Sequence, residues 1–459
     1  MEERFHHLIK KYDFAGPRYT SYPPAPVFTS NFDSEDYRAA IMLEELEVPT
    51  PDLSLYVHLP FCDTLCYFCG CTTVVTPNHD LCEKYLVALA KEIDLLRELL
   101  NPDRKIVQLH WGGGTPTFLS PIQIERLAAL LRSSFSFSND AEVSVEIDPR
   151  GLTFDHMKAL RDGGFNRVSL GVQDFDPKVQ YAVNRIQSES TTFRAIEWTR
   201  ALGFQSLNMD LIYGLPFQTV NTFGCTLKKA IGVAPDRLAI YNFAYVPWIK
   251  KHQKLIDPLD LPSTGTKLNL LTMTIDEMTD AGYEYIGMDH FARPDDELAI
   301  ARRKKTLRRN FQGYSTRAGS DLYGLGMSAI SRFGGVYSQN TKSLTEYRSA
   351  IEKGGFATHA GYRMTFDDRV REYVIMKLMC DLELEISFVE DKFDINFEEY
   401  FNESLMRLEP LIADSLVSVT PNEIKIRTLG RLFLRNIAHC FDAYSSIAQQ
   451  GKPLYSRTV

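Results

Sequence analysis

The sequence predicts an α/β fold built on a parallel sheet, followed by a mostly helical C-terminal region. Two observations predict the sheet. From residue 53 onward short apolar runs alternate with amphipathic helical segments, and runs such as LNMDLIYG are apolar almost without interruption. Such alternation implies right-handed crossovers between parallel strands, and continuous apolar runs are typical of strands buried on both faces. A barrel and a doubly wound sheet both satisfy this pattern.

The first distinctive segment is GPRYTSYPPAPVF, at residues 16–28. It holds four prolines and two tyrosines. Because proline fixes φ and lacks an amide donor, the segment should be extended rather than helical or paired in a sheet. We therefore expect an N-terminal arm over residues 1–35 that lies across the body of the protein.

The repeated strand–helix units should occupy residues 36–300. Strands are expected over residues 53–60, 107–112, 143–148, 167–173, 207–213 and 237–244. The clearest helix spans 80–100, where leucine and isoleucine recur at three- and four-residue steps. Another, over 120–132, begins with Ser120 as N-cap and Pro121 as first helical residue. The run YEYIGMDHF at 283–291 follows an expected helix around 266–281 and is a candidate to extend the sheet.

After about residue 300 helical patterns dominate, and we expect a separate, mostly helical domain over residues 301–459. One helix is expected at 343–353. Another should begin after Thr365, an N-cap candidate with Asp367 and Asp368 in the first turn. The run LVSVTPNEIKIRT predicts a hairpin around Pro421 and Asn422, followed by a helix over 429–441.

Composition excludes several classes of protein. The chain has 459 residues, 44% of them hydrophobic, which is ample for a core. Its net charge of −8 gives no attraction to nucleic acid or anionic membrane. It lacks an apolar run long enough to span a bilayer, and MEERFHHLIKKYDF is unlike a secretion signal. We expect a cytoplasmic protein with neither nucleic-acid nor membrane partners.

Half of the eight cysteines fall within ten residues, in HLPFCDTLCYFCGC directly after the first expected strand. Disulfide frameworks suit short secreted chains, and structural zinc would prefer two separated C-x2-C pairs or paired histidines. Three thiolates at C-x3-C-x2-C, here Cys62, Cys66 and Cys69, can hold three irons of a [4Fe–4S] cluster. The fourth iron is then open to chelation by S-adenosylmethionine. Spacing alone does not exclude Cys71 as a ligand.

This loop resembles the signature of the radical S-adenosylmethionine superfamily, and WGGGTP at 111–116 resembles its second motif. The strings GPRYTSYP, YVHLPFC, CYFCGC, QLHWGGGTPT, VQDF, DLIYGLP, MDHFA and NFQGY resemble one family within it, the oxygen-independent coproporphyrinogen III oxidases (dehydrogenases). The likeness runs from residue 16 to 443. It implies an incomplete TIM-like (β/α)6 barrel with an extended N-terminal arm and a mostly helical C-terminal domain.

The resemblance also implies cofactors and site residues. One [4Fe–4S] cluster would be held by Cys62, Cys66 and Cys69, and two S-adenosylmethionine molecules would bind. The cluster-bound molecule would contact Tyr56, Gly113, Glu146 and Ile330. The second would contact Phe68, Gly114, Thr115, Gln173, Arg185, Asp210 and Ala244. Catalytic roles are implied for Tyr56, Cys71, Glu146, Phe311 and Gln312, with Cys71 tied to activity without ligating the cluster.

These assignments agree with the physical pattern. Barrel enzymes do chemistry at the C-terminal ends of their strands, and the motif residues fall near the ends of the six expected strands. Glycines let backbone amides approach a carboxylate. Glu146 can accept from an ammonium group, Asp210 from a ribose hydroxyl or ammonium, and Arg185 offers a fork to a carboxylate.

The implied reaction is oxidative decarboxylation of two propionates of coproporphyrinogen III to vinyls, giving protoporphyrinogen IX by way of a 5′-deoxyadenosyl radical. The implied partners are that substrate, a flavodoxin- or ferredoxin-like electron donor and an electron acceptor, with the enzyme a monomer. The rivals are a haem carrier, another radical enzyme acting on a tetrapyrrole, and a zinc-stabilised interaction protein. Gly70–Cys71, the arm and NFQGY favour the enzyme over the carrier.

Two further features have modest interpretations. His58 shares a strand face with Tyr56 and is expected to be a hydrogen-bonded barrel histidine rather than a ligand. The run RRKKTLRR at 302–309 carries six positive charges in eight positions. It is expected to be a solvated helix face, with attraction of the substrate's propionates as the functional alternative.

Overall fold

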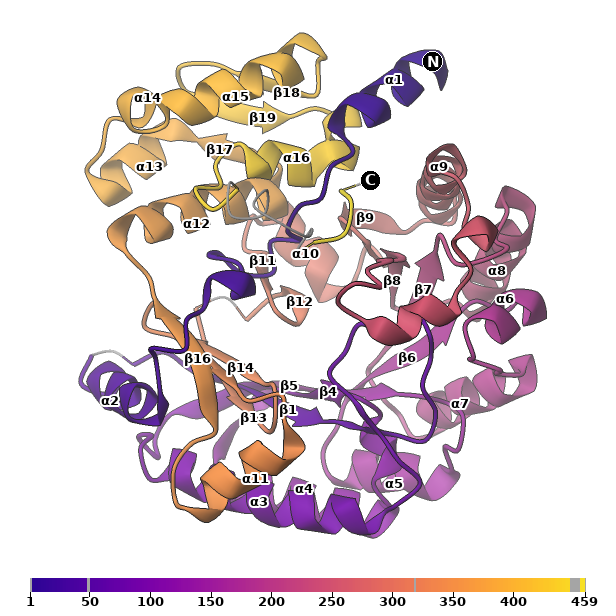
Figure 1. The fold of residues 1–459 in the computed structure, drawn as a ribbon, viewed down its shortest axis with the longest axis vertical. Coiled ribbons are helices and arrows are strands. Elements are labelled where there is room, and N and C mark those ends of the chain that lie inside the picture. Colours follow the sequence, from indigo (N-terminus) through magenta and orange to yellow (C-terminus); the bar gives the residue numbers. More distant parts are fainter. Residues whose placement is uncertain (1, 48–49, 318, 446–454, 459) are drawn as a thin grey trace.

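The computed structural model describes residues 2–47, 50–317, 319–445 and 455–458 (Figure 1). At its centre lies a twelve-stranded sheet. From one edge to the other the strands are β16 (Thr358–Arg363), β15 (Val336–Asn340), β14 (Ile330–Phe333), β13 (Asp321–Leu325), β1 (Leu53–Leu59), β4 (Lys105–Gly113), β5 (Ser136–Ile147), β6 (Arg167–Gln173), β7 (Ser206–Tyr213), β8 (Arg237–Asn242), β10 (His290–Ala292) and β9 (Glu284–Gly287). Within the described residues the edge strands β16 and β9 do not pair with each other, so the barrel is incomplete, as expected.

The strands from β13 to β8 run parallel, and those beyond them on both sides are antiparallel. All six expected strands are present, with β6 at its predicted bounds, and β9 and β10 extend the sheet as predicted. The helices between the parallel strands are α3 (Asp80–Arg97), α4 (Pro121–Ser134), α5 (Phe154–Asp162), α6 (Pro177–Ala182), α7 (Glu189–Ala201) and α8 (Val220–Val233), and α9 (Thr264–Asp280) connects β8 to β9. Ser120 caps α4 by accepting from the Gln123 amide.

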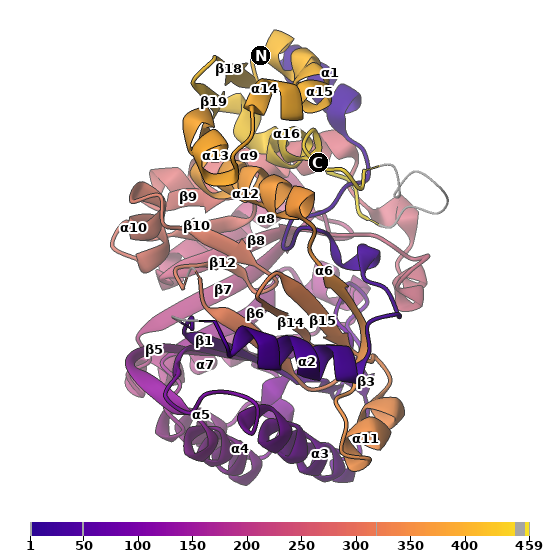
Figure 2. The ribbon, with the colours of Figure 1, turned by 90° about the vertical axis from the view of Figure 1, so that its left-hand side faces the viewer.

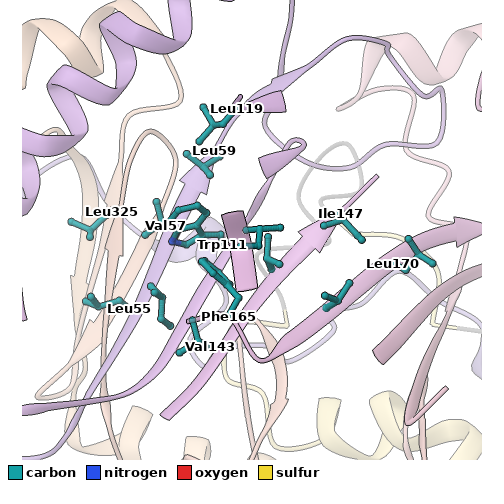
Figure 3. Packing of buried hydrophobic residues seen from close by; sticks show 14 of the residues in the cluster. Leu55, Val57, Leu59, Trp111, Leu119, Val143, Ile147, Phe165, Leu170 and Leu325 are labelled. Atoms are coloured by element: carbon teal, nitrogen blue, oxygen red, sulfur yellow. The ribbon is translucent and has the colours of Figure 1, made fainter. Parts of the chain in front are cut away.

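The pleat of the strands divides core from site. Trp111 is fully buried and meets Phe165 edge to face, with ring centroids 4.7 Å apart (Figure 3). In β1, Leu55 and Val57 belong to this same core. Successive side chains of a strand point to opposite faces. The residues of β1 that alternate with Leu55 and Val57 therefore point into the barrel. The strand periodicity therefore places a row of polar side chains inside the barrel.

One expectation about secondary structure differs from what is observed. Helices were expected to dominate after residue 301, but β11 (Arg308–Asn310), β12 (Gly313–Ser315) and the strands β13–β16 all lie within residues 308–363. These strands are short, so their periodicity is weak in the sequence, and pairing with β1 and with one another decides their state. The expected helices are present as α11 (Leu344–Glu352) and α12 (Phe366–Asp381), the latter capped by Thr365.

The C-terminal region is helical, as expected. It contains α12, α13 (Ile386–Phe393), α14 (Phe397–Tyr400), α15 (Asn402–Ala413) and α16 (Leu434–His439), with β17 (Glu383–Glu385) beside the predicted hairpin of β18 (Val417–Val419) and β19 (Glu423–Ile426). Its core also takes in Leu8 and Tyr12 of α1 (Glu2–Tyr12). Figure 2 shows α1 beside α15, at the opposite end of the molecule from α3 and α4.

The arm at 16–28 is largely extended, as predicted, and joins the two parts of the molecule. Arg18 donates to the Asp289 carboxylate and to the Asn242 carbonyl, each over 3.0 Å. Arg435 of α16 donates to the Gly16 and Pro17 carbonyls. Among the described residues, no helix combines the length and apolar character that crossing a membrane requires.

Candidate active site

The cysteine loop is closed at its base by backbone pairing. Phe61 and Cys62 form β2 (Phe61–Cys62), which pairs in parallel with β3 (Val74–Val75). On one side, beyond α6, the Asn184 amide donates to the Leu65 carbonyl over 2.8 Å. Residues 63–73 therefore form a loop held at its base and on one flank.

The other flank of the loop is held by residues 250–253. The Lys250 ammonium donates to the Cys71 carbonyl over 3.0 Å, and His252 Nε2 lies 2.8 Å from the Cys69 carbonyl oxygen. The buried Gln253 amide lies 3.3 Å from the Phe68 carbonyl and 3.1 Å from that of Ala244. Lys250 directly precedes the short helix η3 (Lys251–Leu255), and His252 and Gln253 lie within it.

Two adjoining cavities, each of about 590 Å³, lie at the C-terminal ends of the parallel strands. The first lies inside the barrel and is lined by Tyr56, Phe311, Gln312 and Ile330, among others. The second lies against the cysteine loop and is lined by Cys62, Cys66 and Cys69. The side chains or backbone that line both are Cys71, Gly113, Glu146, Ser169, Asp210 and Tyr241. The cavities are thus separated only by a thin wall of residues.

The three glycines after Trp111 are required by close packing. A Cβ on Gly112 would lie 2.8 Å from the Glu146 carboxyl carbon, and one on Gly114 would lie 2.6 Å from the Pro60 carbonyl. Gly113 has φ +111°, and a Cβ there would lie 2.4 Å from the His58 ring. Side chains at these positions would collide with Glu146, the His58 ring and the backbone at Pro60, so only glycine fits.

The carboxylates of Glu146 and Asp210 have different charge states. Burial opposes ionisation of Glu146, but hydrogen bonds from His110 and from the Gly113 amide outweigh it and hold its pKa below the ordinary value. Burial, together with the charge of Glu146, raises the pKa of Asp210 to about 6. Asp210 accepts from Ser169 and Asn208. The wall therefore carries one fixed negative charge and one that titrates near neutrality.

His58 orients Tyr56, in agreement with the prediction that it is a hydrogen-bonded barrel histidine. Its Nε2 lies 2.9 Å from the Thr72 carbonyl and must donate to it, so its Nδ1 accepts from the Tyr56 hydroxyl at 3.0 Å. Burial lowers the pKa of His58, which favours the neutral ring that this arrangement needs. The Tyr56 ring also stacks on His110, with centroids 5.9 Å apart.

The residues around the cysteines fit an iron–sulfur cluster with small-molecule ligands beside it. Arg150 Nη2 and Arg185 Nη1 approach Cys66 Sγ at 3.3 and 3.7 Å, and donors of this kind stabilise thiolate sulfur. Asp148 pairs with both arginines. Gln173 Oε1 and Arg185 Nε are buried without protein partners in the wall of the second cavity. Unsatisfied groups of this kind call for a polar ligand.

The donor set is also consistent with a cluster. Within the described part of the chain no three His, Cys, Asp or Glu side chains surround a position for a single ion, whereas a cube spreads its cysteine ligands over separate irons. Burial raises the pKa of Cys62 to about 12, and a hydrogen bond from Cys71 lowers that of Cys69. Binding to iron would offset the cost of ionising the buried Cys62 thiol.

Every predicted site residue except Ala244 lines one or both cavities. Ala244 lies just beyond β8, and its carbonyl accepts from Gln253, which also donates to the loop at Phe68. Sequence reasoning missed His110, Asp148, Arg150, His252 and Gln253. His110 alternates with Gln108 along a recognised strand, and Asp148 and Arg150 follow the end of β5, so strand-end position could have signalled these three. Residues 250–253 lie in a long loop whose course the sequence does not predict.

The basic run lies outside the cavities. Arg303, at the end of α10 (Glu297–Arg303), pairs with Glu284; Lys305 pairs with Glu383, and Arg309 stacks on Tyr314. Among the described residues that line the two cavities there is none of these six charged residues. The run is therefore not the solvated helix face that was expected: α10 ends at Arg303, Arg308 and Arg309 lie in β11, and Arg309 is buried.

Residues 56–230 match the Radical SAM superfamily, and residues 364–433 match the HemN C-terminal domain. The oxygen-independent coproporphyrinogen III oxidase of Salmonella typhimurium is 48% identical over 95% of this chain and 94% of its own length. The chain belongs to the oxygen-independent coproporphyrinogen III oxidase family. The family member from Synechocystis is 45% identical over 98% of this chain and 97% of its own.

The solved structure of coproporphyrinogen III oxidase (HemN) from Escherichia coli, described as a radical SAM enzyme, has the same fold. It superimposes with a TM-score of 0.91 at 47% identity, covering 96% of this chain and 98% of that one. The expected cofactors, a [4Fe–4S] cluster and S-adenosylmethionine, are those of the radical SAM superfamily to which this oxidase family belongs.

Proposed function

We propose that this chain catalyses the oxygen-independent oxidative decarboxylation of two propionates of coproporphyrinogen III to vinyl groups, yielding protoporphyrinogen IX. The observation that carries the proposal is the pair of adjoining cavities, one walled by the three cysteines and one inside the barrel. They meet at Cys71, Glu146 and Asp210. Each has the size of a small-molecule site. A radical formed at the junction of the two cavities would reach a substrate in the barrel cavity without crossing solvent.

Cys62, Cys66 and Cys69 would hold the cluster, which when bound supplies the electron that splits S-adenosylmethionine. Glu146 would bind the ammonium group of the first S-adenosylmethionine, since His110 and Gly113 keep its carboxylate charged and fixed. Tyr56 and Ile330 would line the same site. Gly113 has no side chain, so the backbone at this position would approach the bound molecule closely.

A second S-adenosylmethionine would lie beside the loop, against Phe68, Gly114, Thr115 and Ala244. Arg185 would bind its carboxylate through the unpartnered Nε, and Gln173 would accept through Oε1. Asp210 would bind a ribose hydroxyl or an ammonium group. The roles of Arg185 and Gln173 use polar atoms that the protein leaves unsatisfied.

The substrate would occupy the barrel cavity. Both amide atoms of Gln312 are buried there without protein partners, and Phe311 beside it supplies an apolar face. Gln312 would therefore orient a propionate and Phe311 would stack on the macrocycle. Cys71, exposed and facing both cavities, would donate or accept hydrogen where they meet.

The arm at 16–28 would shield the radical from solvent. Arg18 lies over the Tyr241 ring, with its guanidinium carbon 5.9 Å from the centroid, and Tyr241 lines both cavities. Deleting residues 1–30 should raise the 5′-deoxyadenosine formed per vinyl group. An unchanged ratio would exclude this role.

Further parts of the proposal concern partners and organisation. A flavodoxin- or ferredoxin-like protein would donate electrons, a separate acceptor would take the final electron, and the enzyme would act as a monomer. All eight cysteines are free thiols, which supports a reducing, cytoplasmic setting.

The arm would span residues 1–35. The barrel unit would extend to about residue 363, because β13–β16 pair within its sheet.

The test is anaerobic turnover of reconstituted protein with coproporphyrinogen III, S-adenosylmethionine and dithionite, following tetrapyrrole mass and 5′-deoxyadenosine together. The proposal expects loss of two carbon dioxide molecules per substrate. Tight haem binding without any vinyl product would instead identify a carrier.

A further inference from the structure

The surface beside the cysteine loop combines exposed apolar side chains with lysines. In residues 248–255, WIKKHQKL, there are three lysines and no acidic residue, in a chain of net charge −8. Trp248, Ile249 and Leu255 are 40, 49 and 62% exposed, and Leu259 just beyond is 91% exposed. We call residues 248–259 the loop-flanking patch; it holds three lysines and one exposed acidic residue, Asp257. Large exposed apolar side chains gathered in one place mark interaction sites.

The loop-flanking patch is joined directly to the cysteine loop. Lys250 and His252 donate to the carbonyls of Cys71 and Cys69, and Gln253 donates to that of Phe68. Ile256 is buried in a small core cluster that also receives Tyr67 and Phe68 of the loop. A partner seated on the patch would therefore lie one backbone layer from the cluster ligands.

The same surface continues onto α6, on the other side of the loop. The Lys178 ammonium lies 4.0 Å from the centroid of the Phe217 ring, and the Phe217 amide donates to the Asp260 carbonyl at the end of η4 (Pro258–Asp260). Tyr181 and Ile186 are 77 and 66% exposed. Apolar and basic groups thus flank the cysteine loop from both sides.

We propose that the loop-flanking patch is the docking surface for an acidic, low-potential one-electron carrier protein, an inference that rests on the proposed function. Lys251 and Lys254 would steer an acidic partner, and Trp248, Leu255 and Leu259 would form the contact. In each encounter the carrier loses one electron and the cluster gains it, with no bond made or broken. The basic character of the patch favours this partner over a second copy of this acidic chain.

The test measures binding of a purified flavodoxin of strong negative charge to the cluster-loaded chain. The double variant Lys251→Glu/Lys254→Glu should raise its Kd about tenfold or more at low ionic strength, as loss of charge complementarity requires. The matched control is Lys84→Glu/Lys91→Glu, which reverses two exposed lysines on α3, on the outer side of the barrel (Figure 1). The control should leave the Kd within about twofold.

A second pair tests the apolar contact, with Leu259→Ser against Ile122→Ser, which lies on α4 and is 74% exposed. Turnover driven by dithionite should be unchanged in all four variants, whereas turnover driven by reduced flavodoxin should fall only in the patch variants. Equal binding by the patch and control variants would overturn the proposal, as would a patch variant that alters only self-association. If dithionite gives no vinyl product with any protein, the proposed function fails, while the Kd values still judge the docking surface.

Discussion

His252 Nε2 lies 2.8 Å from the carbonyl oxygen of Cys69, a residue 183 positions earlier in the chain. The ring donates to the backbone of Cys69, the third of the proposed cluster ligands, and so holds this part of the loop in place. Replacing His252 with alanine removes one partly buried hydrogen bond, worth about 1 kcal/mol. We expect His252→Ala to fold normally but to lose iron several-fold faster to a chelator.

The measurement is iron and sulfide content over time in chelator, with His359→Ala as control because His359 is exposed on β16. Equal iron loss in the two variants would show that the contact does not position the loop.

Cysteine substitutions should separate ligands from catalytic groups. Cys66→Ser should abolish reconstitution of the cluster absorbance, because three thiolates are needed to hold it. Cys71→Ser should keep the cluster and S-adenosylmethionine binding but lose at least about tenfold in vinyl formation, since Cys71 would act at the junction of the cavities. The exposed Cys225 supplies the control Cys225→Ser. Loss of the cluster in Cys71→Ser would make Cys71 a ligand instead.

Gly113 should tolerate no side chain. Gly113→Ala combines strain at φ +111° with a Cβ 2.4 Å from the His58 ring, and we expect a loss of about 2 to 4 kcal/mol in the free energy of unfolding. Gly151→Ala is the matched control, because its φ is +73° but nothing lies within 4 Å of the added Cβ. It should cost only about 1 kcal/mol. Urea denaturation measures both, and similar losses would contradict the steric argument.

Affinity for S-adenosylmethionine should depend on pH through Asp210. Its pKa is raised to about 6 by burial and by Glu146, so the carboxyl is neutral below pH 6 and charged above. A positively charged ligand prefers the charged form, so the Kd should rise as pH falls through about 6 and level off above it. Calorimetric titration with S-adenosylmethionine at pH values from about 5 to about 8 measures this change in Kd. Asp210→Asn should flatten the dependence, and a variant with the wild-type profile would assign it to another group.

Arg18 should couple the arm to the site. Its guanidinium donates to Asp289 and to the Asn242 carbonyl, and it lies over Tyr241. We expect Arg18→Ala to raise the ratio of 5′-deoxyadenosine to vinyl groups about two- to tenfold, because solvent then competes for the radical. Arg97→Ala, at an exposed position of α3, should leave the ratio unchanged. A normal ratio in Arg18→Ala would mean that the arm is held without this side chain.

The sequence by itself determined the strand–helix repeat, the cysteine loop after β1 and the glycine row after Trp111. Each of these rests on local chemistry: alternation of apolar residues, thiolate spacing, and backbone positions that admit no side chain. The position of Glu146, Gln173 and Asp210 near the ends of the expected strands also predicts that they lie on one rim.

Only the tertiary structure decided the rest. The short strands β13–β16 follow no strong local pattern, and they join the sheet because β1 offers β13 an unpaired edge. The hydrogen bonds from His252 and Gln253 to the cysteine loop join segments more than 180 residues apart. The two charge states of Glu146 and Asp210 likewise arise from burial and neighbours. Chain folding sets such long-range contacts and burial, and the order of residues along the chain does not reveal them.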